Sequence, residues 1–92
     1  MKNTYIYLCN GSQSSKKFHD KLLNRIHKIT ASLDPKKRYK SKDLYGKKSW
    51  KMLSVAERSL VESCMCNFAI NQLAMLDFVG TSSNNFALFK LA

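Results

Sequence analysis

The chain has 92 residues, a formal net charge of +10 and a hydrophobic content of 45%. This length suits one small domain, and the apolar content argues against a disordered chain. No run of about 18 apolar residues is present, so we expect no transmembrane helix. The apolar run at residues 5–9 is too short for the core of a signal peptide, so we expect a cytoplasmic protein.

The basic residues are distributed very unevenly. Residues 1–51 hold 14 of the 16 Lys and Arg against three Asp, a net charge of +11, whereas residues 52–92 carry a net charge of −1. A basic half joined to a near-neutral, apolar half predicts a polyanion-binding face on a small core. Nucleic acid is the leading partner. An anionic membrane surface, an acidic protein and a merely solvated basic surface are the alternatives.

Residues 3–9 predict a short strand, because Tyr, Ile and Leu are good strand formers, and residues 10–14 predict a turn. Ser14 or Ser15 then caps a helix of about 17 residues. Apolar residues recur along its face at helical spacing: Phe18, Leu22, Ile26, Ile29 and Leu33. We expect this helix to end at Asp34, because the residue before a proline is pushed out of the helical region.

Residues 36–40 form a basic connector that includes a short extended piece. Ser41 is expected to cap a second, short helix, with Asp43 in its first turn. Gly46 is expected to end or bend that helix. Residues 47–53 then form a further helical turn or an ordered loop that carries Trp50.

Ser54 and Glu57 have the spacing of a capping box, which marks the start of a long helix. The helix is expected to run to about residue 74. Its predicted core face consists of Ala56, Leu60, Val61, Cys64, Met65, Phe68, Ala69 and Leu73. Residues 75–79 and 86–91 predict two strands joined by a loop at residues 80–85, which is a β-hairpin.

This order of elements is that of a winged-helix domain, in which a helix pair is followed by a two-stranded wing. Residues 38–92 also resemble the C-terminal part of small winged-helix proteins encoded by phages and mobile elements. The shared features are Trp50, Leu53-Ser54, Glu57-Arg58, Phe78-Val79 and Asn84-Asn85. From the length and the order of elements we expect one α+β, winged-helix-like domain over residues 1–92, with the helix after Ser54 able to enter the major groove of DNA.

The leading hypothesis is therefore a small DNA-binding regulator or accessory factor of a phage or mobile element. Phosphate contacts are predicted for Lys36, Lys37, Arg38, Lys40, Lys42, Lys47 and Lys48. Base contacts are predicted for Arg58, Ser59, Ser63 and Asn67. The long helix also carries Glu57 and Glu62, and the loop at 80–85 is uncharged, so most affinity is expected from residues 36–51. A two-fold operator would require a homodimer, formed through the N-terminal strand or the first helix.

A non-catalytic protein inhibitor is the alternative function. A phage-encoded blocker of a host defence complex, of the anti-CRISPR kind, would use the basic face to bind an acidic or nucleic-acid-binding host protein. Residues 1–92 show no Gly-rich phosphate loop and no nucleophile–base pair, so we expect neither an enzyme nor a cofactor.

The cysteines and aromatic residues are interpreted as structural. Cys64 and Cys66 would point about 200° apart on a helix, which disfavours a shared zinc ion, and with Cys9 we expect them reduced. His19 and His27 are expected at the surface or partly buried. Tyr39 and Tyr45 are expected to pack under lysine stems. The remaining large aromatic side chains are assigned to the core: Trp50, Phe68, Phe78, Phe86 and Phe89.

Overall fold

The computed structural model describes residues 5–8, 11, 13–84 and 86–92. The elements in this part of the chain are β1 (Tyr5–Tyr7), β2 (Gln13–Ser15), α1 (Lys16–Thr30), β3 (Arg38–Tyr39), α2 (Ser41–Tyr45), α3 (Lys47–Lys51), α4 (Val55–Ile70), β4 (Leu76–Thr81) and β5 (Ala87–Leu91). The domain is therefore α+β, as predicted. The ends of the expected first strand, Cys9 and Asn85 lie outside the described residues.

Helix α1 begins where the sequence predicts. The Ser15 hydroxyl accepts a hydrogen bond from the main-chain N–H of Phe18 at 3.2 Å, which caps the first turn. The helix ends at Thr30, earlier than expected. The Thr30 hydroxyl donates to the carbonyl of His27 at 2.9 Å, and the Ser32 hydroxyl donates to the carbonyl of Ile29 at 3.0 Å. These side-chain bonds compete with the helical ladder and close the helix before the proline is reached.

The predicted cap of α2 is wrong. Ser41 is the first residue of the helix rather than its cap, and its side chain is fully buried. The cap position belongs to Lys40, whose main-chain N–H donates to Asp43 Oδ2 at 3.1 Å. Asp43 thus lies in the first turn as expected. Gly46, with φ of 105°, turns the chain from α2 into α3, because few residues other than glycine adopt this backbone conformation.

The capping box of α4 is confirmed. The main-chain N–H of Glu57 donates to the Ser54 hydroxyl at 3.1 Å, and the main-chain N–H of Ser54 donates to Glu57 Oε1 at 2.9 Å. The helix ends at Ile70 rather than near residue 74. Its last turn is closed by Gln72, which has φ of 56° and whose side-chain amide donates to the carbonyl of Ala69 at 3.1 Å.

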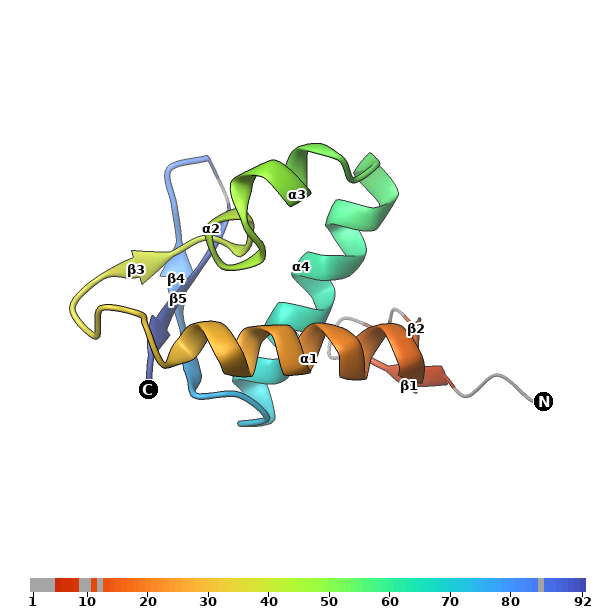
Figure 1. The fold of residues 1–92 in the computed structure, drawn as a ribbon, viewed down its shortest axis with the longest axis horizontal. Helices are drawn as coiled ribbons and strands as arrows, with labels where there is room; N and C mark the ends of the chain where they lie inside the picture. The colour runs from red at the N-terminus through yellow and green to blue at the C-terminus, as the bar shows by residue number, and fades with distance from the viewer. Residues whose placement is uncertain (1–4, 9–10, 12, 85) are drawn as a thin grey trace.

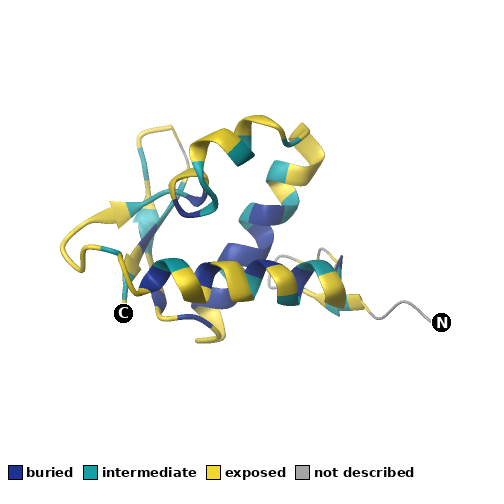
Figure 2. Ribbon diagram, viewed as in Figure 1, coloured by how far each residue is buried: buried dark blue, intermediate teal, exposed yellow. Residues whose placement is uncertain are grey.

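Only part of the predicted core face of α4 is buried. Figure 2 shows that the helix is mainly exposed near its N-terminus and buried along its C-terminal half. Ala56 is exposed because it belongs to the first turn, which extends beyond the core. Leu73 is 39% exposed because the helix has already ended.

The predicted hairpin is present and gains a third strand. β4 and β5 pair antiparallel, with an irregularity between Phe78 and Gly80, and β3 pairs with the other edge of β5 through Arg38↔Lys90 and Tyr39↔Phe89. The sheet order is β3-β5-β4, and β1 pairs separately with β2. Phe89 is buried as expected. Phe78 and Phe86 are 47% and 43% exposed, so their assignment to the core is wrong.

Helix α1 follows the long axis of a molecule that measures 43 × 24 × 24 Å, with β1 and β2 at one end and the three-stranded sheet at the other (Figure 1). In Figure 1, helix α4 passes behind α1, and helices α2 and α3 lie above α1. The core between these elements includes Ile26 from α1, Leu44 from α2, Phe68 from α4 and Phe89 from β5. No helix in the described residues is both long and apolar enough to cross a membrane.

Candidate nucleic-acid interface

A groove of about 610 Å³ opens on the side of α2 and α3 that faces α4 and the hairpin; we call it the interface groove. It is lined by Lys40, Lys42, Lys47, Trp50, Lys51, Val55, Arg58, Ser59, Glu62 and Phe86. Three separate parts of the chain therefore build it: residues 40–51, the exposed N-terminal half of α4 and the end of the hairpin loop. The fold brings the basic segment of the sequence against the long helix at this place.

The groove is strongly cationic. Its lining carries five basic side chains and one carboxylate, that of Glu62. Among the residues that the structure describes, none of these lysines forms an ion pair. The Lys40 ammonium lies 5.4 Å from the centroid of the Phe86 ring, which holds this charge at the mouth of the hairpin loop. The arrangement leaves most of the positive charge free to meet anionic groups on a ligand.

Arg58 is held by the protein itself. Its Nε donates to the main-chain carbonyl of Trp50 at 3.1 Å, and its Nη2 donates to the carbonyl of Lys51 at 3.4 Å. The guanidinium also lies 5.8 Å from the centroid of the Trp50 ring. These carbonyls belong to the last turn of α3, and that of Trp50 also accepts from the main-chain N–H of Leu53 at 3.1 Å. Arg58 therefore ties α3 to α4 through Nε and Nη2, and within the described residues its Nη1 donors are left for other partners.

Arg25, on α1, likewise ties neighbouring helices together through its guanidinium. Its Nη2 donates to the main-chain carbonyl of Tyr45, the last residue of α2, and lies 3.3 Å from the Ser49 hydroxyl on α3. The guanidinium is 4.4 Å from the centroid of the Tyr45 ring. Neither role is predictable from the sequence pattern, because the partners of the two arginines are main-chain carbonyls 20 and 8 residues away. Together they hold α2 and α3, each a five-residue helix, between the two long helices.

The predicted phosphate-binding residues fall into two groups. Lys40, Lys42 and Lys47 line the interface groove. The other four predicted residues do not line it: Lys36, Lys37, Arg38 and Lys48. Lys51 lines the groove but was missed, although its place at the end of a basic segment beside Trp50 was visible in the sequence. The groove therefore takes its lysines from residues 40–51, and the connector at 36–38 lies outside its lining.

The predicted base-reading residues fall into two pairs. Arg58 and Ser59 line the groove, with Ser59 exposed and Arg58 partly engaged through Nε and Nη2. The prediction that Ser63 and Asn67 face solvent is wrong, because they are only 8% and 5% exposed. The Ser63 hydroxyl donates to the carbonyl of Ser59 at 3.0 Å within α4. The exposed stripe of α4 is shorter than the pattern indicated because α1 covers the C-terminal half of the helix.

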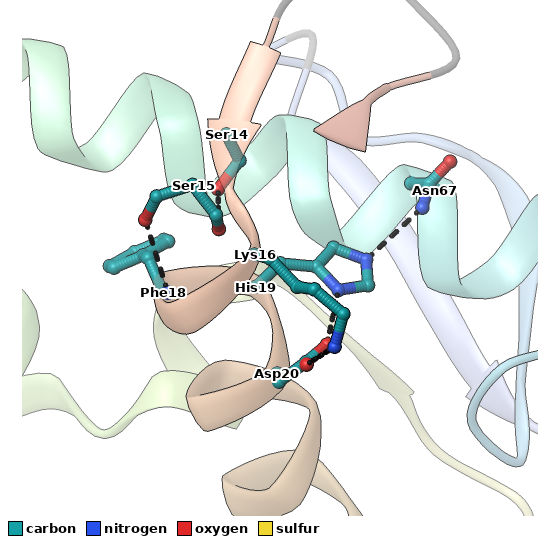
Figure 3. Close-up of polar contacts among 7 residues, drawn as sticks. All are labelled: Ser14, Ser15, Lys16, Phe18, His19, Asp20 and Asn67. Carbon is teal, nitrogen blue, oxygen red and sulfur yellow. Dashed lines mark hydrogen bonds and ion pairs between the residues drawn. The ribbon is translucent and has the colours of Figure 1, made fainter. Parts of the chain in front are cut away.

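Asn67 instead joins a polar chain that links α4 to α1 (Figure 3). Its Nδ2 lies 3.3 Å from Nε2 of the buried His19, whose Nδ1 lies 3.2 Å from Asp20 Oδ1. Asn71 donates to Asn67 Oδ1 at 2.8 Å. These contacts fit an imidazole that carries its proton on Nδ1 and accepts at Nε2. His19 is thus a structural residue of the helix interface, more deeply buried than expected.

Lys16 lies 2.6 Å from Asp20 Oδ2 at the end of this chain, and hydrogen bonds from Lys16 and His19 hold the pKa of Asp20 below its ordinary value. Burial raises the pKa of the Cys64 thiol. Cys64 and Cys66 are not joined in a disulfide. Within the described residues, no three His, Cys, Asp or Glu side chains are grouped as a metal ion would require.

Comparison of the chain with protein-family models, with curated proteins and with solved structures finds no match.

Proposed function

We propose that this protein is a small, non-catalytic DNA-binding protein that holds duplex DNA in the interface groove. It would act as a regulator or accessory factor of a phage or mobile element. The observation that carries the proposal is the set of five cations around the groove, with a single carboxylate opposing them. Neutralisation of phosphates by lysine and arginine supplies most of the affinity of weakly specific DNA-binding proteins.

The arrangement of charges favours binding to the DNA backbone over reading of its bases. Four lysines of the groove belong to a segment whose backbone Arg25 and Arg58 hold in place: Lys40, Lys42, Lys47 and Lys51. The main chain that carries these four ammonium groups is therefore fixed. On α4, Ser59 and the remaining nitrogen of Arg58 are the donors left for base edges. We therefore expect affinity that depends strongly on salt and weakly on sequence.

The cytoplasm is the proposed compartment, since a buried Cys64 outside any disulfide suits a reducing environment. For DNA sites with two-fold symmetry, the protein would bind as a homodimer.

Fluorescence anisotropy with a labelled random duplex, at about 50 mM and 200 mM salt, tests the proposed function. Replacement of Lys40, Lys42 and Lys47 by Ala should flatten the salt slope by about three units. The matched variant, with Ala at residues 36–38, removes the same charge outside the groove and should have a smaller effect. Absence of binding by the wild type at low salt, or equal effects of the two variants, would contradict DNA binding in this groove.

A protein inhibitor is the second candidate function, and exposed apolar side chains beside the groove favour it. Met52 and Val55 are 86% and 82% exposed, and Val55 lines the groove beside the lysines. Exposed apolar side chains next to cations suit an acidic protein surface with an apolar centre. If the wild type fails to bind DNA, and an acidic host protein co-purifies with it but not with a Met52→Ser/Val55→Ser variant, the inhibitor function is favoured.

A further inference from the structure

A second basic groove, of about 480 Å³, lies between α1 and α2; we call it the α1 groove. It is lined by Phe18, Lys21, Leu22, Asn24, Arg25, Lys28 and Tyr45. Three of these side chains are cationic and none is acidic, which makes the lining more uniformly positive than that of the interface groove. The proposed function makes no use of this surface.

The cations of the α1 groove form a row along one face of the helix. Lys21, Arg25 and Lys28 are spaced four and three residues apart, so they lie on successive turns over roughly 10 Å of helix axis. Phosphates of one DNA strand follow one another at about 3.4 Å along the duplex axis, so the row is long enough to face about three of them. Lys21 and Lys28 are exposed, and neither forms an ion pair within the described chain.

The two grooves have no lining residue in common, and both border the segment formed by α2 and α3. Tyr45 lines the α1 groove and Trp50 lines the interface groove, and their rings meet edge to face with centroids 6.1 Å apart. This aromatic contact therefore lies where the two grooves adjoin. A DNA backbone bound to the lining of the interface groove therefore uses none of the residues that line the α1 groove.

We propose that the α1 groove binds the backbone of a second DNA duplex, so that one protein chain holds two duplexes together. This inference rests on the proposed function, because it assumes that the interface groove binds the first duplex. The charge of the α1 groove selects a polyanion, and its row of cations matches a regular series of phosphates better than the irregular charges of a protein surface.

A bridging experiment tests this inference. A biotinylated duplex on beads is loaded with protein, unbound protein is removed, and capture of a second, fluorescent duplex is measured. Wild-type protein should capture the second duplex. A Lys21→Gln/Lys28→Gln variant should capture about tenfold less, because two phosphate contacts are lost, while its affinity for a single duplex by anisotropy stays close to that of the wild type. The matched control is Lys17→Gln/Lys90→Gln, which removes the same charge from exposed lysines that line neither groove and should capture like the wild type.

The outcomes separate this inference from the proposed function. Failure of the wild type to bind the first duplex contradicts the proposed function itself. Binding of the first duplex without capture of the second overturns only the bridging role. Capture that survives in the Lys21→Gln/Lys28→Gln variant also overturns it, because bridging would then come from self-association. Capture of fluorescent poly-glutamate in place of the second duplex would assign the α1 groove to an acidic protein and overturn it as well.

Discussion

Arg58 donates from Nε to the main-chain carbonyl of Trp50 at 3.1 Å while its guanidinium lies 5.8 Å from the indole ring of the same residue. Both contacts draw the end of α3 onto the start of α4. Because α3 carries Lys47 and Lys51 into the interface groove, the position of these charges depends on an arginine that was expected to read bases. In the proposed complex with DNA, Arg58 would therefore act chiefly through the lysines that it positions.

Replacement of Arg58 by Ala should lower the free energy of unfolding by about 1 kcal/mol, since hydrogen bonds from a charged group are lost at a half-exposed site. DNA affinity should fall on all sequences alike. Urea melts and anisotropy on random and selected duplexes measure the two effects. Ser59→Ala, at the exposed neighbouring position, is the control and should leave stability unchanged. If Arg58→Ala weakens binding only to a selected sequence and leaves stability intact, Arg58 is a base-reading residue after all.

Ser54→Ala should destabilise the protein by about 1 kcal/mol, because the first turn of α4 loses the acceptor for the N–H of Glu57. Thermal melts of the two proteins decide this. An unchanged midpoint would show that the capping box contributes nothing to the start of α4.

Ser41→Ala should not destabilise the protein, in contrast to Ser54→Ala. The Ser41 hydroxyl is buried and has no hydrogen-bond partner among the described residues, so its removal leaves no partner unsatisfied. A buried polar group without a partner costs about 1–3 kcal/mol, and alanine avoids that cost while keeping helix propensity. The same thermal melts should show a midpoint equal to or above that of the wild type. A clear loss of stability would indicate that the hydroxyl is hydrogen-bonded.

These two serines show how far the sequence predicts the fold. Ser54 caps a long helix whose pattern and capping box agree, so local chemistry determines its role. Ser41 also precedes a helical segment, but Leu44 stands where a capping box needs Glu or Gln, and α2 is only five residues long and packs against the core, where Leu44 is buried. Tertiary packing therefore decides where α2 begins. The hairpin and the start of α1 were predictable because local sequence signals determine them, as they determine the role of Ser54.

The positive charge of the candidate site was predictable from the sequence, but the residues that line it were not. The excess of lysine in residues 36–51 indicated the basic face, yet which lysines meet α4 depends on the turn at Gly46 and on the position of the hairpin loop. Asn67 followed the expected spacing of an exposed face, and only the placement of α1 over α4 buries it. Such long-range packing leaves no local signal in the sequence.

Glu57 should make stability depend on acid pH. Hydrogen bonds from the main chain and side chain of Ser54 hold the pKa of the Glu57 carboxyl below its ordinary value. A lowered pKa in the folded state gives stability that is present above the unfolded value of about 4.3 and is lost as the pH falls through the folded value. Between about pH 6 and pH 3, the melting midpoint of the wild type should therefore fall further than that of Glu57→Gln. Equal falls would contradict the carboxylate's part in the cap.

The buried pair of Asn67 and His19 separates a structural role from a role in recognition. Asn67→Ala removes the amide that lies 3.3 Å from His19 Nε2 and leaves this buried nitrogen without its partner on α4. We expect a loss of about 1–3 kcal/mol in the free energy of unfolding, with the salt slope of DNA binding unchanged. Ser59→Ala, on the exposed part of the same helix, should show the reverse: unchanged stability and an altered preference among duplexes. Chemical denaturation and anisotropy on a panel of duplex sequences measure both quantities for both variants. If Asn67→Ala leaves stability intact and changes the sequence preference, the side chain reaches the DNA, and the arrangement of α1 over α4 described above does not persist in the complex.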